Sequence, residues 1–298
     1  MDEMIDWDAE AEEVPIPIEL PNMIASVSAR IDSLVIFDLA ITQITGSADM
    51  NPDGIIFNEA NATMFGGSAD GKMEWMVPDP LRTNMRFEGS LENLRADVFF
   101  RDTGFLGENS RIHEYVTGQF SADINYYSEL DETISPDIET TDATGSFGMD
   151  RANLSGHPIQ MTLSRFLRAS ELESVNLDEW TANFTIRDAV MTLEDLRLTS
   201  DNIGIELNGT QHMVTEEINF TATLFLPERF KGAIASVISN RAADALQQED
   251  GTLAVPVRIT GTSSNPQVRP DTSVIEEIVR DALRDGAGNV LRNLFNRN

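Results

Sequence analysis

The sequence predicts a mainly β protein, built as an antiparallel sheet with a few short helices and an amphipathic C-terminal helix. Apolar and polar residues alternate in successive segments of residues 180–270, as in INFTATLFL at 218–226. Because side chains along a strand point to opposite faces in turn, such segments form a sheet with one apolar and one polar face. In addition, few segments have helical spacing, so few helices are available to cover the apolar face.

In the N-terminal half, turn residues separate the predicted strands. Asn51-Pro52-Asp53-Gly54 predicts a tight turn, and the glycines within residues 66–71 break the chain again. The strands predicted here cover residues 34–44, 55–65, 72–77, 84–100 (as a pair of strands) and 118–126. Residues 128–146 are polar and acidic, and we expect them to form a mobile loop.

In the C-terminal half, helices are predicted between strands. Residues 158–180 are expected to hold one or two short helices and residues 228–247 a further helix, because their apolar residues recur at helical spacing. The strands predicted here cover residues 184–186, 190–198, 203–207, 218–226 and 253–259.

The C-terminal segment has the clearest helical pattern of the chain. Ser273 and Glu276 predict a capping box, and Gly286 and Gly288 predict an interruption. The apolar residues that follow the cap recur every three or four positions: Ile275, Ile278, Val279, Ala282 and Leu283. Such a helix lies on a membrane, docks on a partner or caps the end of the sheet, and the mixed charge of its polar face favours the last two.

The charge of the chain argues against nucleic-acid binding. The chain has 21 Lys and Arg against 50 Asp and Glu, a net charge of −29, whereas phosphate contacts need clustered basic residues. Lys72 and Lys231 are the only lysines, which fits either adaptation to high salt or simply a soluble acidic surface. There is no cysteine, so no disulfide framework exists.

No motif in the sequence supports catalysis or metal binding. Residues 66–72 nearly match a phosphate-binding loop, but Met73 stands where Ser or Thr must hold Mg²⁺. Residues 49–60 have the spacing of a calcium loop, but Ala60 occupies the last ligand position, so a hairpin turn fits better. The three histidines lack the spacing of zinc ligands: His113, His157 and His212. We therefore expect no catalytic residue, no metal and no cofactor.

At several places the strands resemble the C-terminal domain of AsmA-family proteins. The resemblance is carried by residues 184–188, 190–198 and 203–209, and above all by VPVRITGTSSNPQVRPD at 255–271, where an apolar strand enters Gly-Thr, Asn-Pro and Pro-Asp. Thr63-Met64-Phe65-Gly66-Gly67 also resembles the family's strand end with an aromatic residue and two glycines. The resemblance covers roughly residues 30–271, although Ala189 replaces the usual turn glycine. It rests on pattern, not on a catalytic signature.

The resemblance implies a function. AsmA-like proteins are similar to TamB and other repeating-β-groove proteins; they are anchored in the inner membrane, lie in the periplasm, and are implicated in phospholipid transport and in outer-membrane protein assembly. For the fold, the resemblance implies a long, bent, groove-like antiparallel sheet with an apolar concave face, here a β-groove domain at residues 23–271. Composition predicts an acidic, proline-containing linker at residues 1–22, and helical spacing predicts the C-terminal helix at 272–298. The chain has no run of about 18 apolar residues that would span a bilayer, so we expect the membrane anchor to lie outside it.

Physical chemistry gives the same expectation for the apolar face. A one-sided sheet must hide that face against another layer or a ligand, and acyl chains are suitable ligands. We expect the lipid contacts to come from Phe184, Ile186, Met191, Leu193, Ile203, Ile205, Leu207, Phe220, Leu224, Val255 and Val257. A charged residue at Leu207 or Leu224 is expected to abolish lipid binding and leave a folded protein.

Two alternatives remain at this point. The apolar residues could form the core of an ordinary closed sandwich. The protein could also be an assembly factor that holds outer-membrane or periplasmic proteins through its strand edges or its C-terminal helix, without carrying lipid.

Overall fold

The protein, here a computed structural model, is described over residues 20–36, 39–79, 82–103, 111–131, 135–200 and 203–295. Within these residues, fourteen strands form one antiparallel sheet, in which strand order follows the chain except that β8 pairs beside β9 on β7. The predicted mainly β, antiparallel fold is therefore confirmed. Most of the predicted linker, residues 1–19, lies outside the described residues.

The strands are β1 (Ala25–Ile36), β2 (Leu39–Asn51), β3 (Gly54–Met64), β4 (Gly67–Asp79), β5 (Arg82–Arg95), β6 (Val116–Leu130), β7 (Asp142–Ser155), β8 (Ser174–Leu177), β9 (Trp180–Arg187), β10 (Val190–Ser200), β11 (Ile203–His212), β12 (Glu217–Leu226), β13 (Leu253–Thr262) and β14 (Pro266–Pro270). The helices are α1 (Ala96–Thr103), α2 (Pro158–Leu167), α3 (Lys231–Ile238), α4 (Asn240–Ala245) and α5 (Thr272–Phe295), with short 3₁₀ turns η2 (Ile112–Glu114), η3 (Ser170–Glu173) and η4 (Glu228–Phe230).

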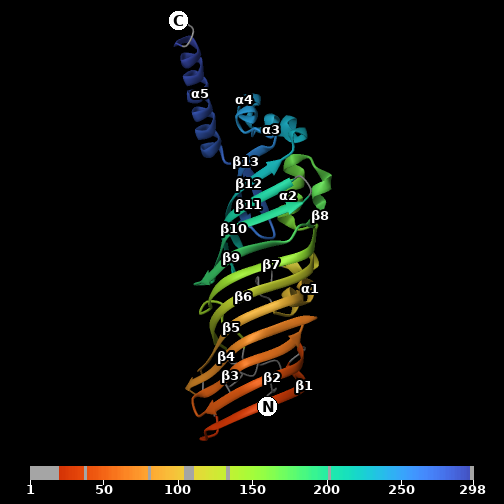
Figure 1. The fold of residues 1–298 in the computed structure, drawn as a ribbon, viewed down its shortest axis with the longest axis vertical. Helices are drawn as coiled ribbons and strands as arrows, with labels where there is room; N and C mark the ends of the chain where they lie inside the picture. The colour runs from red at the N-terminus through yellow and green to blue at the C-terminus, as the bar shows by residue number, and fades with distance from the viewer. Residues whose placement is uncertain are drawn as a thin grey trace, which may run out of the picture.

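The sheet is elongated, with β1 at one end and α5 projecting beyond the other (Figure 1). Helices α2, α3 and α4 gather at the C-terminal end, and α1 lies beside the middle of the sheet. No helix among the described residues combines the length and the apolar character needed to cross a membrane.

Two predicted strands of the N-terminal half are wrong in their bounds. Residues 34–44 contain a hairpin, because β1 ends at Ile36 and β2 begins at Leu39. Apolar residues continue on both sides of this reversal, so the periodicity does not mark it. Residues 84–100 contain one strand and the start of α1, not two strands. There Phe99 and Phe100 pack on Phe120, and this tertiary contact favours the helix.

The predicted loop at residues 128–146 is shorter than expected, because β6 continues to Leu130 and β7 begins at Asp142. The hydroxyl groups of Ser128 and Thr141, both buried, form a 3.0 Å hydrogen bond across its base. The predicted helix at 228–247 is divided at Ser239, whose φ is 123°.

The C-terminal helix differs from its prediction at two points. Asp271, rather than Ser273, caps it, since its carboxylate accepts hydrogen bonds from Ser273 Oγ and from the Val274 N–H. The helix also continues through Gly286 and Gly288, where we predicted an interruption.

Paired residues define the two faces of the sheet, because residues directly opposite in an antiparallel pair point to the same side. We call the side of Phe184 and Phe220 the inner face. One row across it consists of Ala60, Gly71, Gly89, Ile124, Gly145, Phe184, Leu193, Gly209, Phe220 and Ile259, each paired with the next. The opposite side is the outer face.

Glycines and bulges bend the sheet along this row. Gly71 and Gly89 face each other, and a Cβ added to Gly89 would lie 2.1 Å from the carbonyl oxygen of Asp70. The strands approach here more closely than any side chain allows. Residues with positive φ also interrupt the pairing register in β2, β3, β5, β7 and β10: Gln43, Glu59, Asn93, Arg151 and Asp195. Such bulges bend a strand and increase its twist.

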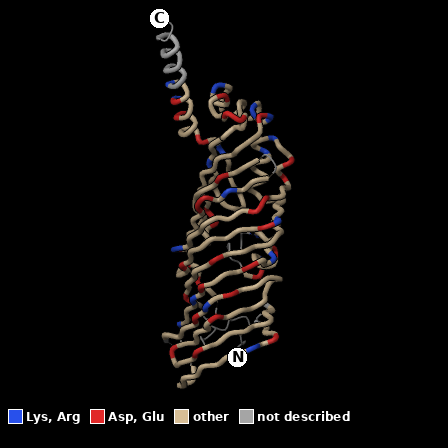
Figure 2. The backbone as a smooth tube through the Cα atoms, in the orientation of Figure 1, with Lys and Arg blue, Asp and Glu red and all other residues tan. Residues whose placement is uncertain are grey.

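Charged residues lie along the whole length of the sheet, and acidic residues outnumber basic ones (Figure 2). The outer face carries many of them: Asp49, Ile56, Glu74 and Arg86 form one row across β2–β5. Lys72, on the same face, pairs with Glu74 at 2.5 Å. Water therefore solvates the outer face.

Candidate functional site

The inner face of β1–β4 is apolar along its whole width and is open. Its side chains include Val27, Ala29, Ile31, Ile44, Ala48, Met50, Ile55, Phe57, Ala62, Ala69, Met73 and Trp75. Val27 is 51% exposed and Ile31 39% exposed, whereas core residues of β13 are almost fully buried. Among the described residues, the helices pack on β5 and later strands. We call this surface the open half.

Helix α1 lies where the open half ends. Phe99 stacks on Phe120 of β6 with ring centroids 4.7 Å apart, and meets Phe65, in the β3–β4 turn, edge to face at 5.7 Å. Its neighbour Phe100 also meets Phe120 edge to face, at 5.2 Å. The buried aromatic cluster thus fixes the helix against the inner face.

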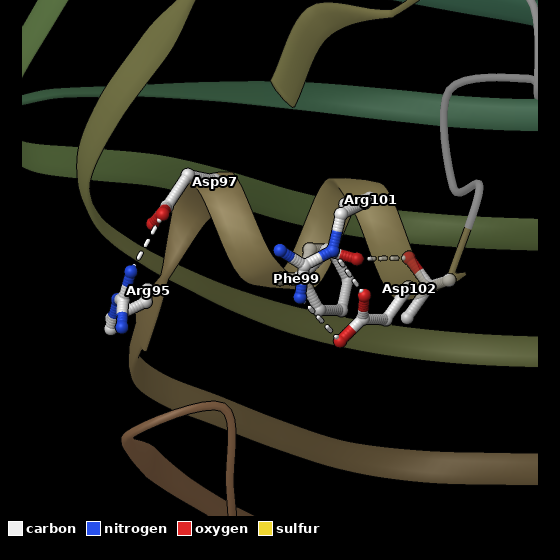
Figure 3. A network of polar contacts seen from close by, with 6 residues as sticks. Arg95, Asp97, Phe99, Arg101 and Asp102 are labelled. Carbon is white, nitrogen blue, oxygen red and sulfur yellow. Dashed lines mark hydrogen bonds and ion pairs between the residues drawn. The ribbon is translucent and has the colours of Figure 1, made fainter. Parts of the chain in front are cut away.

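Ion pairs lie at the two ends of α1 (Figure 3). Arg95 donates to Asp97 at 2.7 Å in the first turn, and Arg101 donates from two nitrogens to Asp102 in the last. Burial acts to raise the pKa of Asp97, but the hydrogen bond and charge of Arg95 outweigh it and lower that pKa. A carboxylate in the first turn also suits the helix dipole.

Beyond α1, the inner face and α2 line an apolar cavity of about 280 Å³, which they cover on part of its surface. Leu163 and Leu167 of α2 line one side, and inner-face residues of β7 and β10–β13 line the other. Phe100 and Val116 belong to the lining nearest the open half. We call this cavity the closed chamber.

Among the described residues that line the closed chamber, His157 is the ionisable one. Its ring Nδ1 accepts a hydrogen bond from the backbone N–H of Ile159 at 3.3 Å, and the backbone N–H of His157 donates to Gln160 Oε1. These two hydrogen bonds together cap α2. Burial lowers the pKa of His157 from 6.5 to about 4. The ring is therefore neutral at neutral pH and adds no charge to the chamber.

The eleven residues predicted to contact lipid share the inner face, but they fall into two groups. Seven line the closed chamber: Met191, Leu193, Ile203, Ile205, Leu207, Phe220 and Leu224. The other four are at most 2% exposed, do not line the chamber and belong to the packed core: Phe184, Ile186, Val255 and Val257. Lipid contact stays a prediction for all eleven.

Sequence reasoning missed the open half, because no residue before Phe184 was among the candidates. The alternation in β3 would have indicated it: Ile55 and Phe57 point inward, while Ile56, between them, lies beside Asp49 and Glu74. The bulge at Glu59 then shifts the alternation by one residue, which obscures it in the sequence.

Two tryptophans place hydrogen-bond donors within the apolar surfaces. Trp75 lies on the inner face in the open half, and Trp180 lines the closed chamber. The indole N–H of each is buried without a hydrogen-bond partner among the described residues. Both indoles are therefore local reporters of what contacts the inner face.

The outer face holds a shallow trough of about 820 Å³ across β3–β7, lined by polar residues such as Asp70, Glu88 and Asp123. In the part of the chain that the structure describes, no three His, Asp or Glu side chains gather closely enough to hold a metal ion. We assign no function to this trough.

Comparison of the chain with protein-family models, with characterised proteins and with solved structures gave no match. Functional inference therefore rests on the geometry of the inner face and on the sequence pattern described above.

Proposed function

We propose that this protein is a non-enzymatic lipid-groove protein that holds phospholipid, or another acyl lipid, against the apolar inner face of its sheet. The observation that carries this proposal is the open half: several strands present only apolar side chains, and the described helices leave them uncovered. A large apolar surface of this kind needs a ligand or a partner to cover it.

An acyl chain fits this surface for a simple energetic reason. Each buried methylene contributes about 0.8 kcal/mol, so a single chain of ordinary length gains several kcal/mol from contact with the inner face. The charged residues on the outer face face water, so a charged head group remains solvated at the rim of the groove.

The cellular setting of the proposal follows from the resemblance to the AsmA family. In this setting the protein acts in the periplasm, in association with the inner membrane, and carries phospholipid towards the outer membrane during outer-membrane biogenesis. The sheet is elongated (Figure 1), and apolar side chains lie on its inner face in both the N-terminal and the C-terminal strands, which supports a carrier more than an enzyme pocket.

The direct test is native mass spectrometry and lipid extraction of protein purified without detergent. We expect one or more acyl lipids to remain bound. Ile55→Gln and Ile56→Gln form a matched pair, because both isoleucines are half-buried neighbours in β3 and point to opposite faces. Ile55→Gln should reduce the bound lipid, whereas Ile56→Gln should leave it unchanged.

Equal lipid content in the two variants, or no lipid in the wild-type protein, would refute the proposal. Binding of outer-membrane proteins without any lipid would instead favour an assembly factor. Leu207 and Leu224 are poor test sites, contrary to our expectation from sequence, because they are only 9% and 1% exposed. A buried charge there would unfold the sheet rather than only block a ligand.

A further inference from the structure

We infer that the closed chamber takes the tail end of one acyl chain, about eleven carbons long, while the head group stays outside. This inference rests on the proposed function. It adds the place on the sheet where a bound lipid stops and the orientation of the lipid there. Three features of the chamber support it: its volume, its uncharged lining and its position.

The volume matches part of one chain. An apolar protein cavity of about 150 Å³ holds one benzene, which has six carbons. By the same ratio the closed chamber, at about 280 Å³, holds roughly eleven carbons. A diacyl lipid is far too large to enter, so only the end of a chain fits.

The lining excludes a charged head group. No Lys, Arg, Asp or Glu is among the described residues that line the chamber, and burial keeps His157 neutral. Gln160 already donates from Nε2 to the Leu154 carbonyl and accepts from the His157 N–H, and Thr199 donates to Asp178. Ser200, Gln211 and the unpaired indole N–H of Trp180 also line the chamber, so a phosphate or carboxylate there would exchange its full hydration for a few neutral donors and no cation. A hydrocarbon tail has no polar group whose hydration would be lost.

The position links the chamber to the open half. Phe100 lines the chamber, and its neighbour Phe99 packs against Phe65 at the edge of the open half. An acyl chain lying on the inner face of β3–β5 therefore points past α1 towards the chamber. The lipid enters tail first, and α1 marks the boundary between the two compartments.

Single-tryptophan variants test this orientation in the whole chain. Trp7→Phe with Trp75→Phe leaves Trp180 in the chamber, and Trp7→Phe with Trp180→Phe leaves Trp75 in the open half. The probes are phosphatidylcholines with one dibrominated acyl chain, because bromine quenches tryptophan fluorescence on close approach. One carries bromine near the head group and the other near the methyl end.

We expect tail-end bromine to quench Trp180 strongly and head-proximal bromine to quench it little, while both quench Trp75. Quenching of Trp75 without quenching of Trp180 would overturn the inference and leave the proposed function intact. Equal quenching of Trp180 by both probes would overturn the tail-first orientation. If neither tryptophan is quenched and no lipid co-purifies, the proposed function itself fails.

A chamber-filling variant provides a second readout. Val175, a half-buried residue of β8, lines the chamber, so Val175→Phe should reduce the space available there. In the variant whose only tryptophan is Trp180, Val175→Phe should weaken the quenching of Trp180 by bromine near the methyl end at least several-fold. Thr185→Phe, at an exposed outer-face position of β9, is the matched control and should leave the quenching unchanged. Unchanged quenching in Val175→Phe would contradict the inference.

Discussion

Arg258 on β13 donates a hydrogen bond from Nε to Oδ2 of Asp271 at 2.7 Å, and the same carboxylate caps the first turn of α5. One buried side chain therefore joins the C-terminal helix to the sheet. Its pKa is lowered by the hydrogen bond from Ser273, by the Val274 N–H and by Arg258. The link explains why α5 begins where β14 ends.

Replacing Asp271 should destabilise the protein. Asp271→Ala removes the cap and the ion pair, so we expect a loss of about 2 kcal/mol in the free energy of unfolding at pH 7, measured with urea. Asp281→Ala is the control: Asp281 forms an exposed ion pair with Arg284, worth little. Because the Asp271 pKa is lowered in the folded state, its contribution is present above about pH 4 and is lost as the pH falls further. The difference in the free energy of unfolding between wild type and Asp271→Ala should therefore become smaller as the pH falls below about 4. A difference that stays constant with pH would contradict this account.

His157 should make stability depend on pH in a different range. Its folded pKa of about 4 lies below the ordinary 6.5, so the unfolded chain binds a proton first as the pH falls. Between about pH 6.5 and 4 the protein therefore loses up to about 3 kcal/mol through this residue. His157→Asn, which keeps a cap for α2, should show a flatter dependence in urea titrations over this range. If the free energy of unfolding depends on pH in the same way in wild type and His157→Asn, His157 is not a buried neutral histidine.

Gly89 should not tolerate a side chain. The Cβ of Gly89→Ala would lie 2.1 Å from the Asp70 carbonyl oxygen and 2.7 Å from the Gly71 Cα, so β4 and β5 would have to separate. We expect a loss of about 1–3 kcal/mol by chemical denaturation. The matched control is Gly232→Ala in α3, where a Cβ meets nothing within 4 Å, and it should be neutral or stabilising by up to about 1 kcal/mol. Similar effects at both sites would mean that the strands do not approach closely at Gly89.

Removing the Phe99 ring should release α1 from the sheet. Phe99→Ala leaves a cavity beside Phe120 and Phe65, and we expect a loss of about 3–5 kcal/mol together with a weaker near-ultraviolet circular dichroism signal. Val98→Ala, at a half-buried position of the same helix, is the control and should cost much less. A small effect for Phe99→Ala would show that the contacts of the Phe99 ring contribute little to holding α1 on the sheet.

Several features of the fold could be predicted from sequence because they depend on neighbouring residues. The alternation of Ile203, Ile205 and Leu207 predicts a strand and its apolar face, and both are found in β11. The turn before Gly54 follows from Asn51, whose side chain accepts a hydrogen bond from the Asp53 N–H. The reversal between β1 and β2 could not be predicted, since the apolar pattern on its two sides is the same.

The candidate site could be predicted only in part. Leu224 and Leu207 were correctly placed on the inner face, because side chains alternate between the two faces without a bulge along β11 and β12. The open half was missed because the bulges at Gln43 and Glu59 shift this period within β2 and β3. A bulge depends on the register of the neighbouring strand, which a single sequence does not contain.

The sequence by itself determined that this chain forms an antiparallel sheet with one apolar face, because side-chain alternation is a local property of each strand. Only the tertiary structure decided which part of that face is sealed and which is open. Ile31 and Val255 occupy similar alternating patterns, yet Ile31 is 39% exposed and Val255 is fully buried. The difference arises because the helices between later strands fold back over the C-terminal part of the sheet, and such contacts between distant residues leave no local pattern.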